Sequence, residues 1–299
     1  MQQQSNSALL TNAVGWLPIA TAATTVVLWA AAFPAIRIGL TDFTPLSLAA
    51  VRFACASVFA LTWLVWVRPP MPTVPDLFRF MACGGIGISL YNFLLHTGQT
   101  TVSAGAASFI INLQAVLTAF LAMVFLREPF NRWAWLGTSV SVIGVATLAS
   151  GQPGGLSFGE GVTLVLAAAA CSGASFVLQR PLVARYGALS SAAINILMGN
   201  LFLLPWLPTG LTQANAASHP ALSAAIFLGI FPGAIGYLTW MSTLGAFGAA
   251  RAANILYLVP PVATTIAYFA ADEVPTLLTL GGGMIALLGV IIVNTRGRS

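Results

Sequence analysis

Few side chains in this sequence could bind a charged ligand or move a proton, and they stand singly within long apolar stretches. Arg52 and His96 are the strongest of them, and the amides Asn112 and Gln114 stand close together in another such stretch. Burying a charge or an amide among apolar helices is costly unless the group pairs across helices or faces a cavity. The expected chemistry is therefore polar ligand binding between helices.

Arg52 and His96 each have more than one possible role. Arg52 could cap carbonyls at a helix end, pair with Asp42, or bind a substrate carboxylate. His96 could be structural, contact a substrate, or relay protons. Every Asp and Glu stands near the end of an apolar stretch or in a connection. Since ion-coupled transport commonly buries a carboxylate, the sequence favours movement down a gradient, or exchange, over a proton pump.

The adjacent prolines Pro260 and Pro261 interrupt the stretch ILYLVPPVATTIAYF, which is otherwise apolar enough to cross a membrane. Proline has no N–H, so the pair should leave the carbonyls of Leu256 and Tyr257 without helical partners. Such a break is tolerated in a membrane only inside protein or beside a water-filled cavity. The pair therefore marks either a ligand site or a hinge.

Two further apolar stretches carry small residues or a proline at a similar depth. These residues could mark interruptions of the helix or simply allow close helix packing. The predicted hinge or break positions are Gly84, Gly85, Gly87, Pro232, Gly233, Pro260 and Pro261.

Aromatic residues cluster near these positions and predict an aromatic-lined pocket. With amides and freed carbonyls but no fixed opposite charge, such a pocket suits a zwitterion whose side chain is apolar or aromatic. The carbonyls near Leu256 would hold its ammonium, and amides such as Asn112 or Asn254 its carboxylate. The predicted substrate-binding residues are Trp29, Phe33, Tyr91, His96, Asn112, Gln114, Tyr237, Trp240, Asn254, Leu256 and Tyr257.

The elements that must position these residues are membrane helices. Of 299 residues, 58% are hydrophobic and 6% charged, against about 25% charged in globular domains, and the mean hydropathy is +0.92. A helix needs about 20 apolar residues to cross a bilayer, and the alternating pattern of barrel strands is absent. We predict an all-α integral membrane protein in contact with lipid. Its ten expected spans are residues 17–37, 45–67, 77–97, 103–126, 133–150, 159–179, 188–207, 221–242, 247–271 and 275–294.

The composition also excludes several functions. All eleven basic residues are Arg, which removes a Walker P-loop, a lysine Schiff base and a lysine general base. They are scattered singly, so no nucleic-acid partner is expected, and the three cysteines suit apolar positions rather than disulfides. No spacing suggests a metal or cofactor, and neither His has an obvious partner for a serine protease site, so no enzyme is expected.

The distribution of arginine predicts the orientation. Cytoplasmic loops collect positive charge, and with the N-terminus inside, only Arg37 and Arg52 of the eleven arginines lie towards the outside. Both termini are therefore expected in the cytoplasm. The N-terminal residues lack the basic region of a secretory signal, so the first apolar stretch is expected to be retained as a helix.

A weak internal repeat relates the two halves of the chain. At an offset of 143, Arg37 meets Arg180, and at an offset of 145, Glu128 meets Glu273. A duplicated five-helix unit must enter the membrane with opposite polarity, because five is odd. Inverted repeats typify secondary transporters, which bind substrate in a central cavity where the repeats meet. The two predicted repeats are residues 1–150 and 151–299.

Several short motifs carry a family resemblance. They are LWAAAFPAIRIGL in the first span, Pro45 and Arg52 in the second, and the glycine-rich GTSVSVIGVATL and GGGMIALLGVIIV that close the two repeats. The chain resembles the drug/metabolite transporter superfamily, and within it the EamA-type exporters. It is most similar to bacterial exporters of aromatic amino acids, although Ser172 stands opposite Trp29 and Asn195 opposite Arg52.

The resemblance implies export of amino acids across the bacterial inner membrane by alternating access. Export of other metabolites or drugs is an alternative, and so is a channel. Matching small-residue ridges at Gly137, Gly144, Gly282 and Gly289 predict close packing of the fifth and tenth spans. That packing could lie within a monomer or across a homodimer.

Overall fold

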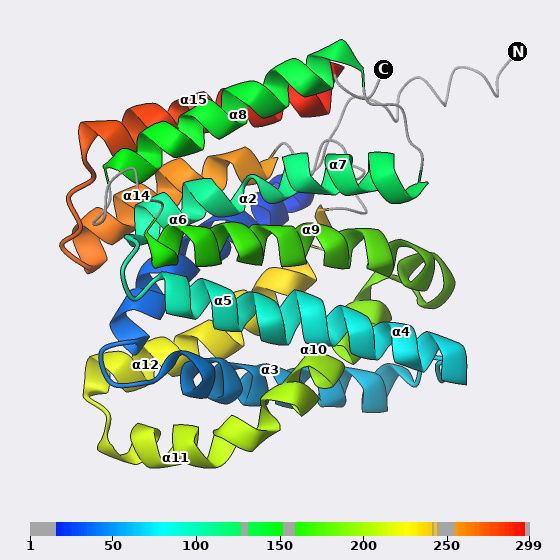
Figure 1. Ribbon diagram of the computed structural model, residues 1–299. Coiled ribbons are helices and arrows are strands. Elements are labelled where there is room, and N and C mark those ends of the chain that lie inside the picture. Colours follow the sequence, from blue (N-terminus) through cyan, green and yellow to red (C-terminus); the bar gives the residue numbers. More distant parts are fainter. Residues whose placement is uncertain (1–15, 127–130, 152–158, 241, 244–254, 297–299) are drawn as a thin grey trace, which may run out of the picture.

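The computed structural model describes residues 16–126, 131–151, 159–240, 242–243 and 255–296. Within these ranges every regular element is a helix (Figure 1). Six helices are long and apolar enough to cross a membrane, and three shorter apolar helices accompany them. The prediction of an all-helical, multi-pass membrane protein is therefore confirmed.

Helices of the first half pack directly on helices of the second half. α3 lies against α10, α2 against α12 and α14, and α9 against α5 and α7. The first half comprises α2 (Trp16–Gly39), α3 (Pro45–Val67), α4 (Val74–Gly84), the π-helix η1 (Gly85–Leu90), α5 (Tyr91–Gly98), α6 (Ala104–Ile111), α7 (Gln114–Leu126) and α8 (Arg132–Ser150). The second comprises α9 (Glu160–Tyr186), α10 (Ala188–Leu203), the 3₁₀ turn η3 (Leu204–Trp206), α11 (Leu207–Ala216), α12 (His219–Leu228), the π-helix η4 (Gly229–Ile235), the 3₁₀ turn η5 (Leu256–Leu258), α14 (Val259–Ala270) and α15 (Leu277–Arg296).

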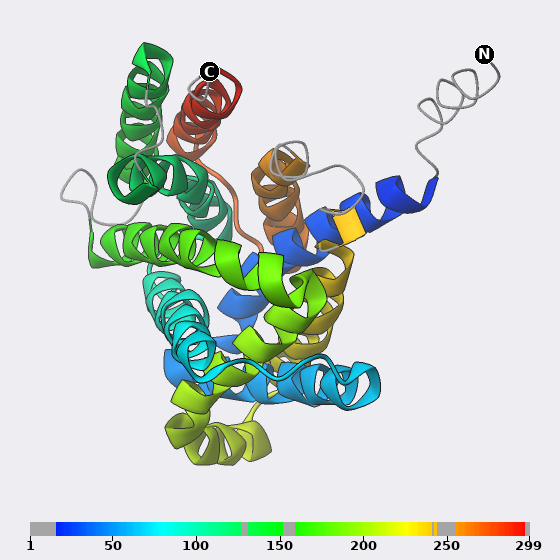
Figure 2. The same ribbon diagram turned by 90° about the vertical axis from the view of Figure 1, so that its right-hand side faces the viewer.

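α8 and α15 form a close pair at one side of the bundle, and α11 lies at the opposite side (Figures 1 and 2). A methyl group added at Gly144 would lie 2.2 Å from the backbone nitrogen of Ala286, and one at Gly289 would lie 2.3 Å from Oγ of Ser141. Only glycine allows the backbones to approach this closely. The predicted small-residue ridges therefore pack together within one subunit.

Four helices are interrupted, and the interruptions repeat between the halves. Gly85–Leu90 and Gly229–Ile235 are π-helical; at an offset of 145 the first range corresponds to residues 230–235. Regular α-helical hydrogen bonding is also interrupted at residues 112–113, between α6 and α7, and the same offset leads to residues 257–258 within η5. π-Helical turns are rare and often occur at functional sites.

In the described residues the helix interruption lies just before the proline pair, in η5. Pro260 and Pro261 lie in the first turn of α14, next to Val259. The first N–H groups of a helix have no partner within it, so prolines are tolerated there. η5 precedes the prolines as a separate 3₁₀ turn, so the predicted break lies next to them and α14 begins there.

Candidate functional site

A cavity lies between the two halves at the level of the four interruptions. Its volume is about 160 Å³, and a single water needs only about 10–15 Å³. Both π-helices reach its wall, through Gly87 and Ile88 in η1 and Pro232 in η4. The cavity therefore has room for a small metabolite, and the interrupted helices form part of its wall.

Aromatic side chains make up one wall of the cavity. Trp29 of α2 stacks edge-on against Tyr237, with ring centroids 5.7 Å apart, and lies 5.3 Å from the ring of Trp240. Trp29 fits because residue 236 is a glycine, whose added methyl would lie 2.7 Å from the indole nitrogen. This wall offers a flat apolar surface to a substrate side chain.

Polar side chains from the second half lie opposite α6 and α7. Ser172 of α9 donates a short hydrogen bond to Gln114, and Gln179 donates to Ser175 at 2.7 Å. All four residues line the cavity. The wall is thus neither purely apolar nor charged on this side.

Arg52 brings a positive charge to the cavity wall. Its side chain comes from α3, the residue is 8% exposed, and it lines the cavity. Nη1 donates to Oδ1 of Asn92 at 3.1 Å and lies 3.3 Å from Nε2 of His96. Asp42, which was one of the possible partners, instead accepts hydrogen bonds from Ser218. Among the described residues no carboxylate pairs with Arg52.

His96 is held as a neutral ring behind Arg52. Its Nδ1 lies 3.0 Å from the carbonyl oxygen of Pro45, which can only accept a hydrogen bond. Nδ1 therefore carries the proton, and Nε2 accepts from the guanidinium, which can only donate. The residue is fully buried, so it supports Arg52 and does not line the cavity.

The expected free carbonyl at Leu256 already has a partner. The N–H of Val259 donates to it, which closes the 3₁₀ turn η5. The Asn112 amide is also engaged, since Nδ2 donates to the carbonyl of Ser108 at 3.0 Å. Leu256 and Asn112, two of the groups expected to hold a substrate's charged ends, therefore each already make one hydrogen bond to local backbone.

Most of the predicted substrate-binding residues do meet at the cavity. Those on its wall are Trp29, Phe33, Tyr91, Asn112, Gln114, Tyr237, Trp240 and Leu256, together with the break positions Gly87 and Pro232. Those away from the wall are His96, Tyr257, Gly84, Gly85, Gly233, Pro260 and Pro261. Asn254 lies outside the described residues.

Several wall residues were not in the predicted substrate-binding set, although binding a substrate carboxylate was one of the possible roles of Arg52. The most informative are Arg52, Asn92, Ser175, Gln179 and Asn195. Arg52 and Asn195 carried a sequence signal, because they are polar, lie within apolar stretches and occupy equivalent repeat positions. Whether Asn92, Ser175 and Gln179 line the cavity depends on the direction in which each side chain points. A single sequence does not reveal that direction.

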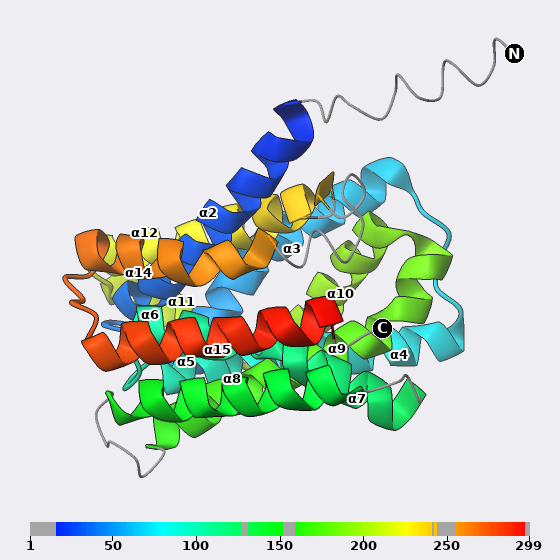
Figure 3. The same ribbon diagram turned by 90° about the horizontal axis from the view of Figure 1, so that it is seen from above.

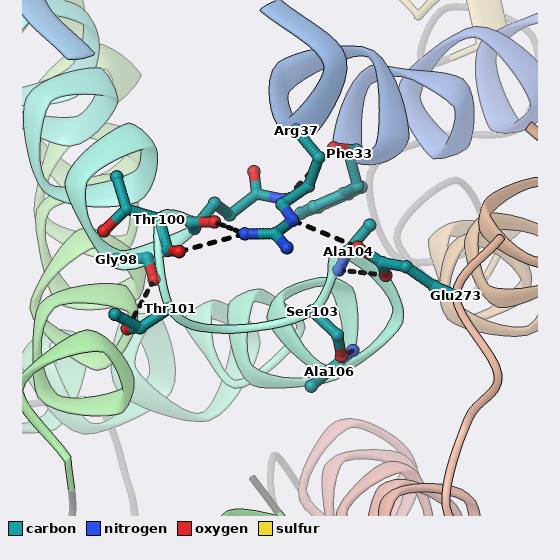
Figure 4. A network of polar contacts seen from close by, with 10 residues as sticks. Phe33, Arg37, Gly98, Thr100, Thr101, Ser103, Ala104, Ala106 and Glu273 are labelled. Atoms are coloured by element: carbon teal, nitrogen blue, oxygen red, sulfur yellow. Dashed lines mark hydrogen bonds and ion pairs between the residues drawn. The ribbon is translucent and has the colours of Figure 1, made fainter. Parts of the chain in front are cut away.

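A second polar network lies at the end of the bundle where α2 stops and α6 starts (Figure 4). Nε of Arg37 pairs with Oε1 of Glu273 at 3.1 Å, and Nη1 donates to the carbonyls of Gln99 and Thr100 at 2.6 and 3.0 Å. Oε2 of Glu273 accepts from the N–H of Ala104 at 2.7 Å. The network ties together α2, the α5–α6 connection and the α14–α15 connection.

At the opposite end, Asp76 of α4 ties the first half to the end of α9. Its carboxylate pairs with Arg79 and Arg185 and accepts a hydrogen bond from the hydroxyl of Tyr186. In the described part of the chain no group of three His, Cys, Asp or Glu could hold a metal ion.

Comparisons with known proteins place the fold and the cavity in a family. The family model described as "EamA-like transporter family" matches residues 16–150 and again residues 159–295. This protein belongs to the EamA-like transporter family, within the drug/metabolite transporter superfamily. It is accordingly a membrane transporter, and the two matches lie one in each half of the chain.

Relatives of this EamA-family member carry transporter names. A "Probable terminal-alkyne amino-acid exporter" of Streptantibioticus cattleyicolor is 37% identical over 91% of each chain. A "Probable amino-acid metabolite efflux pump" of Salmonella typhimurium is 25% identical over 89% of this chain and 91% of its own. One crystal structure has the same fold, with a TM-score of 0.62, 16% identity and coverage of 94% and 97% of the two chains.

Proposed function

We propose that this transporter exports amino acids with apolar or aromatic side chains across a bacterial inner membrane by alternating access. The observation that carries the proposal is the cavity between the halves, where Trp29, Tyr237 and Trp240 form an aromatic wall. Two relatives named as amino-acid exporters or efflux pumps support the substrate class.

The proposed architecture is ten membrane crossings in two inverted five-helix halves. The equivalent interruptions in η1 and η4, and at residues 112–113 and in η5, support a duplication. α2 begins and α15 ends towards the same end of the bundle (Figures 1 and 3), as an even number of crossings requires. The bias of arginine towards one side supports cytoplasmic termini.

The proposed mode is exchange or movement down a gradient. Among the described residues that line the cavity there is no Asp or Glu, and ion-coupled transporters usually place a carboxylate at this level. In this proposal the Arg37–Glu273 network closes one end of the cavity pathway and must open once per cycle.

Purified protein in liposomes tests the proposal. Labelled phenylalanine, tyrosine, tryptophan, leucine and a cationic drug are offered to vesicles preloaded with the unlabelled compound. Saturable counterflow of the aromatic amino acids without a pH gradient is expected. Selective counterflow of the drug would show that amino acids are the wrong substrate class. Conductance without saturation would indicate a channel. Strict dependence on a pH gradient would overturn the proposed mode of transport.

A further inference from the structure

Two buried polar atoms on the cavity wall have no hydrogen-bond partner in the part of the chain that the structure describes. They are Nε of Arg52 and Oδ1 of Asn195. Leaving a buried polar atom without a hydrogen-bond partner is destabilising, and more so when the group is charged. One is a cationic donor and the other a neutral acceptor, so the cavity wall needs both an anion and a hydrogen-bond donor.

Arg52 has more unsatisfied hydrogen-bonding capacity than Asn195, and it also carries a charge. Of its three nitrogens only Nη1 makes hydrogen bonds to described residues, and both acceptors, Asn92 and His96, are uncharged. Because the His96 ring is neutral, it does not repel the guanidinium. Its hydrogen bond to the carbonyl of Pro45 uses Nδ1 and so leaves Nε2 as the atom that accepts from Arg52. A planar guanidinium with free donors is the best protein group for binding a carboxylate.

Asn195 is 4% exposed and belongs to α10, which packs against α3. It stands at the repeat position of Arg52, because 52 plus the offset of 143 gives 195. The two unsatisfied groups therefore come from equivalent helices of the two halves. Asn92 is already committed, since its Nδ2 donates to the carbonyl of Ile88 at 2.7 Å, which leaves Oδ1 of Asn195 as the unsatisfied amide oxygen on the same cavity wall.

We propose that Arg52 and Asn195 together hold the head group of an α-amino acid, with the carboxylate on the Arg52 guanidinium and the ammonium on Oδ1 of Asn195. This rests on the proposed function and deepens it. The aromatic wall of Trp29, Tyr237 and Trp240 then receives the side chain. The repeat is functionally asymmetric, because one half supplies the cation and the other the acceptor.

Substrate analogues separate the two contacts. Competition with labelled phenylalanine counterflow is measured for phenylalanine methyl ester and phenethylamine, which lack the carboxylate, and for 3-phenylpropionate, which lacks the ammonium. The wild-type protein should bind each at least about tenfold more weakly than phenylalanine, since a hydrogen bond to a charged group contributes about that factor. Equal competition by the ester or the amine would overturn the role of Arg52.

Variants assign each contact to its residue. Arg52→Gln should raise the KM for phenylalanine at least about tenfold, and Arg52→Lys by less, because the charge remains. Asn195→Ala should remove the preference for phenylalanine over 3-phenylpropionate and leave the preference over the ester. Asn200→Ala is the matched control: Asn200 lies on the same helix and also has an unpartnered Oδ1, but does not line the cavity.

Two failures are distinguishable. If wild-type protein moves no amino acid but does move another compound, the proposed function fails. If phenylalanine is transported and Arg52→Gln or Asn195→Ala, present in the membrane at wild-type amounts and melting at the wild-type temperature, leaves KM and analogue preference unchanged, only the head-group assignment fails. A loss of preference in Asn200→Ala as large as in Asn195→Ala would also contradict it.

Discussion

At the scale of residues, the main feature is a buried arginine whose charge is left uncompensated by the described side chains. An Arg at the centre of a membrane helix costs about 2.5–3.5 kcal/mol on insertion scales. Two neutral acceptors recover part of that cost at Arg52. A bound anion would offset the rest of that cost. The Arg52 guanidinium is therefore expected to bind a carboxylate more tightly than an arginine that already forms an ion pair within the protein.

His96 is expected to position Arg52 rather than to titrate during transport. His96→Leu removes the acceptor and the bond to Pro45, so KM for phenylalanine should rise about tenfold. His96→Gln keeps an acceptor for the guanidinium and should stay within a few-fold of wild type. The measurement is uptake into liposomes as a function of pH.

The pH profile distinguishes positioning from proton relay. A ring fixed as the neutral tautomer should give wild-type rates that are flat between about pH 6 and 8. A sigmoidal profile in wild type that disappears in His96→Gln would contradict this role.

Residue-level prediction from sequence succeeded for side-chain type and failed for side-chain direction. Aromatic and amide residues such as Trp29, Tyr91 and Asn112 do lie on the cavity wall. His96 was placed with them because it is polar and at the right depth, yet it points to Pro45 and Arg52. Its contacts lie 44 and 51 residues away in the chain, and no local pattern encodes them.

At the scale of elements, the interrupted helices show how backbone geometry positions the site. Repeated glycines indicated where α4 and α12 depart from regular helix, but glycine spacing does not distinguish a π-helix from close packing. The proline pair indicated an interruption beside η5, but not that α14 begins there. Sequence shows that an N–H is missing, whereas the start of α14 depends on where η5 ends.

The α8–α15 contact gives a matched test of helix packing. A methyl at Gly282 would lie 2.4 Å from the backbone nitrogen of Leu148, whereas one at the neighbouring Gly281 meets nothing within 4 Å. Gly282→Ala should destabilise the protein by about 1–3 kcal/mol, while Gly281→Ala should be neutral or stabilising by up to about 1 kcal/mol. Thermal unfolding in detergent compares them, and equal melting temperatures would refute the packing.

The stabilisation that the Arg37–Glu273 network provides is expected to be lost when the two charges exchange positions. Arg37→Ala or Glu273→Ala should each cost about 1–3 kcal/mol, since each breaks hydrogen bonds to a charged group. The charge-swapped pair Arg37→Glu with Glu273→Arg should not recover stability. The swap would direct a carboxylate at the carbonyls of Gln99 and Thr100 and a cation at the N–H of Ala104. Full recovery in thermal unfolding would show that the ion pair alone matters.

At the scale of the whole molecule, the two halves share interruptions but differ in chemistry. Arg52 and Asn195 face one cavity from equivalent positions, and Trp29 corresponds to Ser172. Composition and the length of the apolar stretches were enough to predict a helical membrane protein, and the family resemblance was confirmed. The cavity itself could not be predicted, because it depends on how helices from both halves pack.

The most direct measurement is counterflow of labelled L-phenylalanine into liposomes that hold unlabelled phenylalanine, compared between the wild-type protein and Arg52→Gln. The account predicts saturable accumulation by the wild type without any ion gradient, and a KM raised at least about tenfold in the variant. Absence of phenylalanine counterflow in wild-type vesicles that exchange another solute would contradict it.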